Sequence, residues 1–486
     1  MRILYLDIDT TRADHLGCYG YPRPTSPNLD RIAAQGLRLD NCYVSDAPCL
    51  PSRASMFTGQ FGIHSGVVGH GGTAADLRPI GAARQFRADS QQPTFIEALR
   101  KAGLYPVSFS PFAERHSAWW FYSGWREMYN TGKSGMESGE EVVPRALEWI
   151  KAHGNRDNWL LHINIWDPHT PYRAPKDFGN PFAEEPLAGW YTEELRRKQW
   201  DGFGPGSPQE PAGSLGGPHN KGYPRVPYQI ASMQDYKQWV DGYDCGIRYA
   251  DHWCGQILDA LSRQRVLDET VIIVTSDHGE AMGELSVIGD HATADHSVSR
   301  VPMLISWPGL TMPGAVDSSL HYQTDVAASL IELAGGAVPG HWDGRSFASS
   351  LRDGNTTGRD YVVVSQCAWS CQRAVRWGNH ILIRSYHTGL KNYPPRMLFN
   401  LAEDPHELHD LAESPPGLAD HGQALLEEWT AEMMAASQSG VDPLWTVMRE
   451  GGPYHTRGAL QKYCQRLRET GRERHAEFLE AHPTGL

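Results

Sequence analysis

The chain has 486 residues, and its 57 acidic and 44 basic side chains give a formal net charge of −13. Because binding of nucleic acid by bulk charge needs a basic surface, this balance excludes a general nucleic-acid-binding protein. The length allows about three domains or one large α/β domain with an appendage, and either can bury a sizeable core. The chain has 16 tryptophans, many of them in apparent loops, where they either bind sugars or simply pack.

The sequence shows no targeting or membrane signal. It enters a strand-like run by residue 3 without a basic and then apolar leader, and no apolar stretch approaches the roughly 18 residues that span a membrane. The eight cysteines have no disulfide or zinc-ribbon spacing, and Cys367 and Cys371 form the only close pair. We therefore predict a cytoplasmic protein with reduced thiols, although a chain trimmed of a secretory signal has the same pattern.

Strands and helices alternate over about the first 350 residues. This alternation is typical of a parallel sheet covered by helices, so we predict an α/β fold with a large, mostly parallel central sheet and helices on both faces. The predicted elements are a buried strand at 3–9, helices at 26–35 and 94–102, a strand at 159–165, a long helix at 244–262 and a strand at 270–275.

Two later regions depart from this alternation. Residues 173–230 are rich in glycine and proline, which predicts a long insertion loop near a mouth or an interface. After Gly354, short strands at 361–365 and 372–383 predict a small antiparallel sheet, followed by a charged helical tail at 458–481. The tail has an apolar stripe that docks either on its own domain or on a second copy, so a homo-oligomer is possible. We predict a main domain over 1–355 and a C-terminal subdomain over 356–486.

Two predicted strands end in side chains that bind hard cations. The first strand ends at Asp9, and the strand at 270–275 runs into Asp277 and His278. Because ligands sit beyond the carboxyl ends of strands in open α/β sheets, these three residues could meet and bind a divalent cation. A strand-end aspartate is about as often a helix cap. Asp7 lies about 7 Å further back along the strand, so we expect it to support the ligands without binding.

A third element is the pentapeptide that begins at Cys49 and ends at Arg53, with the pattern C-x-P-S-R. From the residues alone, Cys49 is either a low-pKa nucleophile at a helix start or a small buried hydrophobe. The pattern resembles the signature of the type I sulfatases of the alkaline phosphatase superfamily, and further segments resemble that family in the same order. These are DTTRADHLGCYG at 9–20, CLPSRASMFTG at 49–59, DPHTPY at 167–172, TSDHGE at 275–280, RVPMLISWPG at 300–309 and LFNLAEDPHELHDLA at 398–412.

The resemblance implies an alkaline-phosphatase-like fold whose small C-terminal α+β subdomain holds a four-stranded antiparallel sheet. It also implies a sulfatase that cleaves the S–O bond of a sulfate ester. Cys49 would be oxidised to formylglycine by a formylglycine-generating enzyme. One hydroxyl of the formylglycine hydrate would attack sulfur, and the other would later expel sulfate from the sulfated enzyme.

The same resemblance assigns roles to the remaining motif residues. Asp9, Asp277 and His278, together with the modified cysteine, would bind one divalent cation, for which calcium is our first choice and manganese or magnesium the alternatives. Arg53 would hold the hydrate and the metal ligands, since a guanidinium can bind two oxygens. His169 would contact the sulfate or the leaving-group oxygen.

Several positions depart from the family pattern. Thr10 stands where a second acidic residue is usual, so the metal site is one carboxylate poorer. Cationic or amide residues that the family uses are missing near 70, near 110–116 and before Arg300. We expect histidines to replace them close to the sulfate, and activity to fall steeply as these imidazoles lose their protons. The candidates are His70, His291 and either His116 or Arg115.

Aromatic side chains suggest a sugar substrate, although they equally suit packing of the insertion on the sheet. They include Trp119 and Trp120, Trp190 and Trp200 in the insertion, and Trp445 and Tyr454 near the tail. We predict a sulfated mono- or oligosaccharide, such as a glycosaminoglycan fragment, that contacts Arg115, Trp119 and Trp120. The alternatives are a phosphonate monoester or phosphodiester hydrolase of the same superfamily and, from another class, a catalytically silent binding protein.

Overall fold

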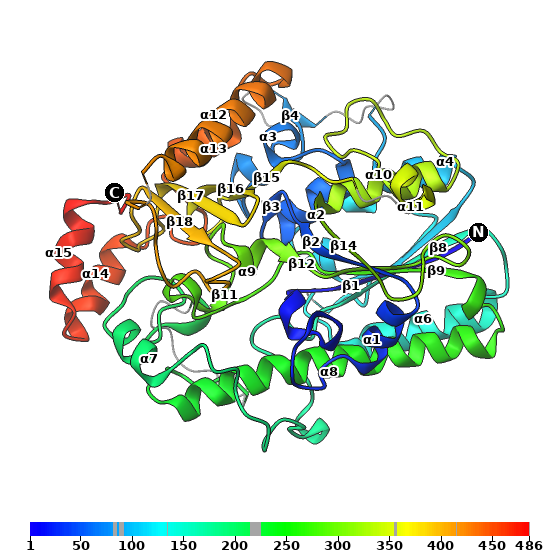
Figure 1. The fold of residues 1–486 in the computed structure, drawn as a ribbon, viewed down its shortest axis with the longest axis horizontal. Helices are drawn as coiled ribbons and strands as arrows, with labels where there is room; N and C mark the ends of the chain where they lie inside the picture. The colour runs from blue at the N-terminus through cyan, green and yellow to red at the C-terminus, as the bar shows by residue number, and fades with distance from the viewer. Residues whose placement is uncertain are drawn as a thin grey trace.

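The computed structural model describes residues 1–80, 85–86, 92–133, 135–213, 225–353, 357–414 and 416–485. A large sheet crosses the molecule with helices on both faces, and a smaller sheet lies beside it (Figure 1). This arrangement confirms the predicted α/β class. In the part of the chain that is described, no helix is long and apolar enough to cross a membrane.

The large sheet has nine strands among the described residues and is mostly parallel around its centre. Its central strand β1 pairs in parallel with β8 on one side and β9 on the other. The predicted strands at 159–165 and 270–275 are therefore neighbours of the first strand. In spatial order the strands are β12 (Arg300–Val301), β2 (Leu37–Tyr43), β13 (Met303–Ser306), β9 (Thr270–Thr275), β1 (Arg2–Ile8), β8 (Trp159–Ile165), β6 (Tyr105–Phe109) and β7 (Glu127–Tyr129), and β14 (Ala315–Tyr322) also pairs with β2.

Alternate residues of β1 enter two different hydrophobic cores, as the two-residue period of a strand requires. Ile3 and Tyr5 belong to one core, and Leu4, Leu6 and Ile8 belong to the other. Because both faces are covered, the open edge for a ligand lies at the carboxyl ends of the strands. The first core is shared with α2 (Cys49–Thr58), α4 (Phe95–Lys101) and α10 (Gln323–Leu333), and the second with α1 (Pro27–Ala34), α6 (Gly139–His153) and α8 (Met233–Arg263).

The region predicted as a long insertion loop is partly helical. It contains α7 (Glu193–Trp200), and residues 214–224 of it lie outside the described part of the chain. The long helix α8 begins at Met233, well before the predicted start at residue 244. Ser232 caps it by accepting a hydrogen bond from the Asp235 backbone N–H, and the sequence analysis missed this signal.

A second sheet is formed mainly by the C-terminal part of the chain. The stretch 372–383, predicted as a strand, lies in a hairpin that turns at Gly378. The four antiparallel strands are β15 (Tyr361–Gln366), β16 (Cys371–Trp377), β17 (His380–His387) and β18 (Arg396–Asn400). A fifth strand, β3 (Asp46–Ala47), pairs in parallel with β15 and comes from the segment just before Cys49. Helix α12 (Leu418–Ala436) packs on this sheet (Figure 1).

The C-terminal tail forms two helices, α14 (Leu460–Glu469) and α15 (Glu473–Ala481), that dock on the same chain. Leu467 and Leu479 pack in one cluster with Phe203, and a buried ion pair joins Arg472 to Glu210. The apolar stripe of the tail is thus covered by the inserted region. The shorter elements are α3 (Gly62–Ser65), α5 (Phe112–Arg115), α9 (His296–Ser299), α11 (Ala348–Asp353), α13 (Pro443–Arg449), β4 (Pro79–Ile80), β5 (Gln85–Phe86), β10 (Ala281–Met282) and β11 (Ile288–Asp290).

Candidate active site

The predicted metal ligands meet at the carboxyl ends of β1 and β9. One donor atom each from Asp9, Cys49, Asp277 and His278 lies within 4.8 Å of every other, and all four residues are buried. Thr10 donates its hydroxyl to Asp9 Oδ1 at 2.7 Å and its backbone N–H to Asp277 Oδ1 at 3.0 Å. Thr10 therefore orients both carboxylates from the position where a second acidic residue was expected.

Cys49 begins α2 and is completely buried. Its Sγ lies 3.0 Å from His278 Nε2, and His278 Nδ1 lies 2.7 Å from the carbonyl oxygen of Gly279. Because Nδ1 carries the proton that it donates to this carbonyl, Nε2 accepts a hydrogen bond from the thiol. Burial, followed by the charges of Asp9 and Asp277, raises the pKa of Cys49 well above its usual value. This direction favours the thiol form of the unmodified residue and argues against its interpretation as a low-pKa nucleophile.

Arg53 lies one turn along α2 and holds three carboxylates together. Its Nε donates to Asp7 Oδ2 and its Nη2 to Asp9 Oδ2, both at 2.9 Å, while its Nη1 contacts Asp277. Asp7 also accepts a hydrogen bond at 3.2 Å from the side chain of Asn164 on β8. Asp7 thus supports Arg53 from behind the ligands, at the place the strand geometry predicts.

These buried carboxylates carry more negative charge than Arg53 balances. Burial and the charge of Asp277 raise the pKa of Asp9 to about 8. For Asp277, burial acts upward, but Arg53 and His278 lower the pKa to about 2. A divalent cation between the two carboxylates would allow both to ionise, and two carboxylates with one imidazole suit such a cation. The residues therefore fit a divalent metal.

His169 and Arg115 form a further part of the candidate site, beside Cys49. Arg115 ends α5, its guanidinium lies over the ring of Trp166 at 3.1 Å from the centroid, and its Nη2 donates to His169 Nε2 at 3.0 Å. His169 Nδ1 lies 2.6 Å from the carbonyl oxygen of Thr170, which fixes its proton on that nitrogen. Arg115 Nη1 is buried without a partner and can donate to an anionic ligand.

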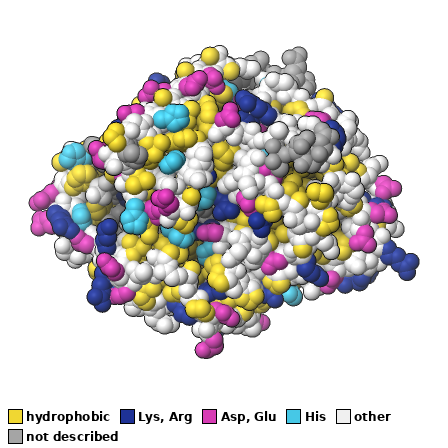
Figure 2. Space-filling view, viewed as in Figure 1, with side chains coloured by type: hydrophobic (Ala, Val, Ile, Leu, Met, Phe, Trp, Pro, Cys, Tyr) yellow, Lys and Arg dark blue, Asp and Glu magenta, His cyan; other side chains and the backbone are white. Residues whose placement is uncertain are grey.

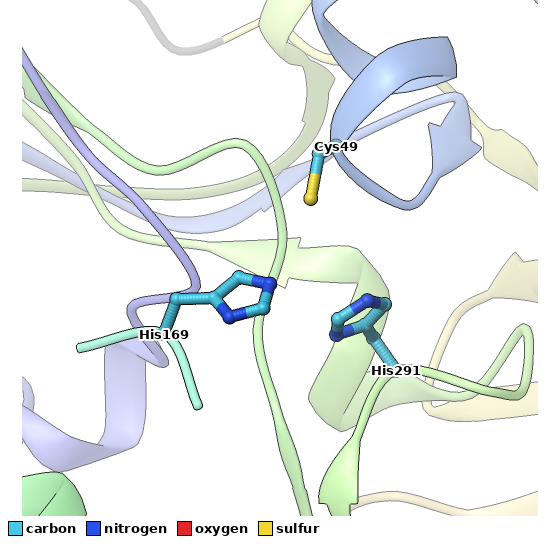
Figure 3. A group of neighbouring side chains, drawn as sticks. All are labelled: Cys49, His169 and His291. Atoms are coloured by element: carbon cyan, nitrogen blue, oxygen red, sulfur yellow. The ribbon is translucent and has the colours of Figure 1, made fainter. Parts of the chain in front are cut away.

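His291 completes this side of the site. Its ring centroid lies 4.3 Å from that of His278 and 5.5 Å from that of His169. Figure 3 shows the rings of His169 and His291 turned toward the sulfur of Cys49. His291 Nδ1 is buried without a hydrogen-bond partner, 3.5 Å from Glu280 Oε2. Like Arg115, it has hydrogen-bonding capacity left for a ligand.

The family comparisons agree with this geometry. The model described as sulfatase matches residues 2–337, and the one described as N-sulphoglucosamine sulphohydrolase, C-terminal, matches residues 289–432. The chain belongs to the sulfatase family. It is therefore a sulfuric ester hydrolase of the alkaline phosphatase superfamily, as the resemblance implied.

Individual relatives of this sulfatase are distant. An N-acetylglucosamine-6-O-sulfatase from Bacteroides thetaiotaomicron is 24% identical over 421 residues, which cover 74% of this chain and 72% of that protein. A protein solved with its substrate D-glucosamine-2-N,6-O-disulfate is 19% identical, with a TM-score of 0.70 and coverage of 91% and 99%. A phosphonate monoester hydrolase from Agrobacterium radiobacter is 18% identical, with a TM-score of 0.69 and coverage of 91% and 96%. The structural matches show a shared fold.

Two of the expected histidines, His70 and His116, lie beside each other in this sulfatase. The rings of His70 and His116 have centroids 5.0 Å apart, and Nε2 of each is buried without a partner. Burial, and then the neighbouring histidines and Arg115, lower the pKa of His70, His116 and His291 well below 6.5. The lowered pKa values favour neutral rings near pH 7 in the free site, which argues against the expectation that protonated imidazoles set a steep pH dependence.

The sequence analysis missed His455, which comes from the C-terminal part of the sulfatase. Its Nε2 lies 2.8 Å from His70 Nδ1, and its ring stacks on Trp369 with centroids 4.3 Å apart. Its backbone N–H donates to Ala368 at 3.0 Å, which ties this loop to the β15–β16 turn. Figure 2 shows several histidine side chains gathered near the middle of this face of the molecule. No motif or period in the sequence marks His455.

The aromatic residues predicted to stack on a sugar have different surroundings. Trp120 is only 3% exposed and packs against Phe57 and Phe112 in the core, so it has no free ring face and its predicted role is not supported. Trp119 is 44% exposed. Of the other aromatic residues, Trp190 stacks on His406, Trp200 lies near Arg196, and Trp445 and Tyr454 are exposed.

Proposed function

We propose that this sulfatase releases sulfate from a sulfated mono- or oligosaccharide, such as a glycosaminoglycan fragment. The observation that carries the proposal is the buried cluster of Asp9, Cys49, Asp277 and His278 beside the unpartnered nitrogens of Arg115 and His291. The N-acetylglucosamine-6-O-sulfatase and the structure with bound glucosamine disulfate support the saccharide class. Arg115 and the exposed Trp119 are the side chains we expect to contact the sugar sulfate.

We further propose that Cys49 is converted to formylglycine by a formylglycine-generating enzyme. The hydrate supplies one hydroxyl that attacks sulfur and a second that later expels sulfate. A fully buried thiol with a raised pKa is a poor nucleophile, which supports the need for this conversion. Asp9, Asp277 and His278 would hold a divalent cation, for which calcium is our choice because carboxylate oxygens suit it.

The remaining residues act on the ester directly. Arg115 Nη1 has no partner in the protein and would donate to a sulfate oxygen. His169 Nδ1 keeps its proton and donates it in a hydrogen bond to the Thr170 carbonyl, so Nε2 is the nitrogen that would hold or pass a proton beside the leaving-group oxygen. Arg53 fixes the two carboxylates. Burial of all these groups excludes water and strengthens each contact.

The test is sulfate release from defined substrates by protein that was produced together with a converting enzyme. Intact mass must first show the change from CH2–SH to CHO at Cys49. We expect release from sulfated glucosamines or glycosaminoglycan disaccharides and none by the Cys49→Ala control. Release only from aryl phosphonates or phosphodiesters would overturn the proposal in favour of the second candidate.

That second candidate is a phosphonate monoester hydrolase of the same superfamily. The match to such an enzyme at a TM-score of 0.69 favours it. Parallel assays on aryl sulfate, aryl phosphonate and sulfated disaccharide separate the two by relative kcat/KM. The complete set of ligands and Arg53 weighs against a catalytically silent binding protein. Cytoplasmic location and oligomeric state stay predictions.

A further inference from the structure

Cys49 belongs to a second group of potential ligands, which contains no carboxylate. Its Sγ and one ring nitrogen each of His169 and His291 lie within 4.8 Å of one another, and all three residues are buried. The three come from separate parts of the fold: the start of α2, the loop after β8 and the segment after β11. Figure 3 shows the sulfur and the two rings facing a common point. Only Cys49 is shared with the carboxylate site.

This donor set differs in chemistry from the carboxylate site. A thiolate with two imidazoles suits zinc, whereas carboxylate oxygens suit calcium, magnesium or manganese. Zinc binds thiolate at about 2.3 Å and imidazole at about 2.0–2.1 Å, so its ligand atoms stand roughly 3.5 Å apart. The donor atoms lie within 4.8 Å of one another, so zinc binding requires the side chains to move closer together. Three protein ligands plus an open position are a common zinc arrangement.

Both imidazoles are oriented as ligands. His169 Nδ1 donates to the carbonyl oxygen of Thr170 at 2.6 Å, so the lone pair of His169 is on Nε2, where it accepts from Arg115 Nη2. Zinc-bound histidines are usually held by such a contact on the other nitrogen. His291 is 5% exposed, and its Nδ1 makes no hydrogen bond, with Glu280 Oε2 lying 3.5 Å away. A buried nitrogen without a partner is costly unless something binds it.

We propose that the protein with unmodified Cys49 binds one zinc ion between Cys49, His169 and His291, and that conversion to formylglycine removes this site. On binding, the Zn–S bond forms as the thiol releases its proton to solvent, and no electron is transferred. The second half rests on the proposed conversion, which replaces a soft sulfur donor by a harder oxygen donor. The chain thus exchanges a zinc preference for a calcium or magnesium preference as it matures.

Arg115 provides an internal check. Its Nη2 donates to His169 Nε2 at 3.0 Å, so a zinc ion on that nitrogen must displace a guanidinium of the same charge sign. Replacing Arg115 by methionine keeps an apolar stem over Trp166 and removes this competition. If His169 is a ligand, Arg115→Met therefore binds zinc more tightly than the parent protein.

The experiment uses the full chain from a host that lacks a converting enzyme, with Cys49 confirmed as a thiol by intact mass. After removal of metal by a chelator, Co2+ is titrated as a stand-in, because sulfur-to-cobalt absorption reports a thiolate ligand. Zn2+ then displaces the cobalt, and bound zinc is counted by elemental analysis. We expect one zinc per chain, none in Cys49→Ala, and affinity reduced more than about tenfold in His169→Ala and His291→Ala.

Matched variants make the result decisive. His409→Ala, at an exposed histidine, should bind zinc like the parent, and Asp9→Asn, at the carboxylate site, should still bind one zinc ion. His169→Asn and His291→Gln replace any alanine variant that fails to fold by circular dichroism. Absence of the thiolate band, or zinc binding that is lost in Asp9→Asn but kept in both histidine variants, would overturn the proposal. Sulfate release by the converted enzyme is measured separately, so failure of zinc binding leaves the proposed sulfatase substrate untouched.

Discussion

Replacing Arg53 by methionine should destabilise the protein, and calcium should restore part of the loss. The guanidinium contacts Asp7 and Asp9 at 2.9 Å and also Asp277, and all four residues are buried. Without the guanidinium, the carboxylates of Asp7, Asp9 and Asp277 lose the positive charge that lies between them. Removing one partner of a buried ion pair costs about 3–5 kcal/mol, and we expect the free energy of unfolding to fall by about that amount.

The assay follows denaturant unfolding with and without calcium. A ligand that binds only the folded state adds about 2.7 kcal/mol when its concentration is about 100 times its Kd. Because the Arg53→Met pocket is more negative, it should bind calcium more tightly than the parent. At any one calcium concentration, the variant should therefore gain more stability than the parent protein does.

Arg373→Met is the matched control. Arg373 makes an equally buried pair with Asp442, at 2.7 and 2.6 Å, on the C-terminal sheet. Its replacement should cost a similar amount, and calcium should stabilise this variant no more than the parent. An equal calcium response of the two variants, or no calcium response of Arg53→Met, would refute the reasoning.

Three further predictions concern a histidine of the candidate site, a buried lysine and two tryptophans. His455→Ala should raise KM for a saccharide sulfate about tenfold and change kcat little, because the 2.8 Å contact that orients His70 is lost, and His455→Gln should restore part of the affinity. Burial lowers the pKa of Lys391 to about 7, so unfolding takes up a proton between about pH 7 and pH 10.5; stability measured by denaturant should rise with pH across that range relative to Lys391→Met. Trp120→Ala should lower the free energy of unfolding by about 3–5 kcal/mol, and Trp119→Ala should lower it by less in the same assay.

The meeting of Asp9 and Asp277 could be predicted because it follows from local rules. Each residue comes directly after a buried strand, and carboxyl ends of parallel strands share one edge of a sheet. The buried position of Asp7 follows from the strand rise in the same way. Arg53 and His169 are different, because only the resemblance to sulfatases assigned them roles, and their contacts with Asp9 and Arg115 became visible in the structure.

Other features depend on contacts that no local rule specifies. His455 meets His70 across 385 positions of the sequence, through the packing of two loops that have no period. The failure at Trp120 has a similar cause, since composition identifies an aromatic ring but not the face it turns to the core. The lowered pKa values of the histidines could not be predicted either, because burial and the nearby charge of Arg115 depend on how the folded chain surrounds these rings.

The strand β3 ties the segment before Cys49 to the small sheet, with Asp46 and Ala47 in register with Ser365 and Gln366. The segment that leads into Cys49 therefore pairs with a strand that lies some 300 residues further along the chain. Because of this pairing, the C-terminal part cannot be exchanged without changing a contact of the segment before Cys49. Swapping the C-terminal part between relatives would therefore change the strand that pairs with the segment just before helix α2.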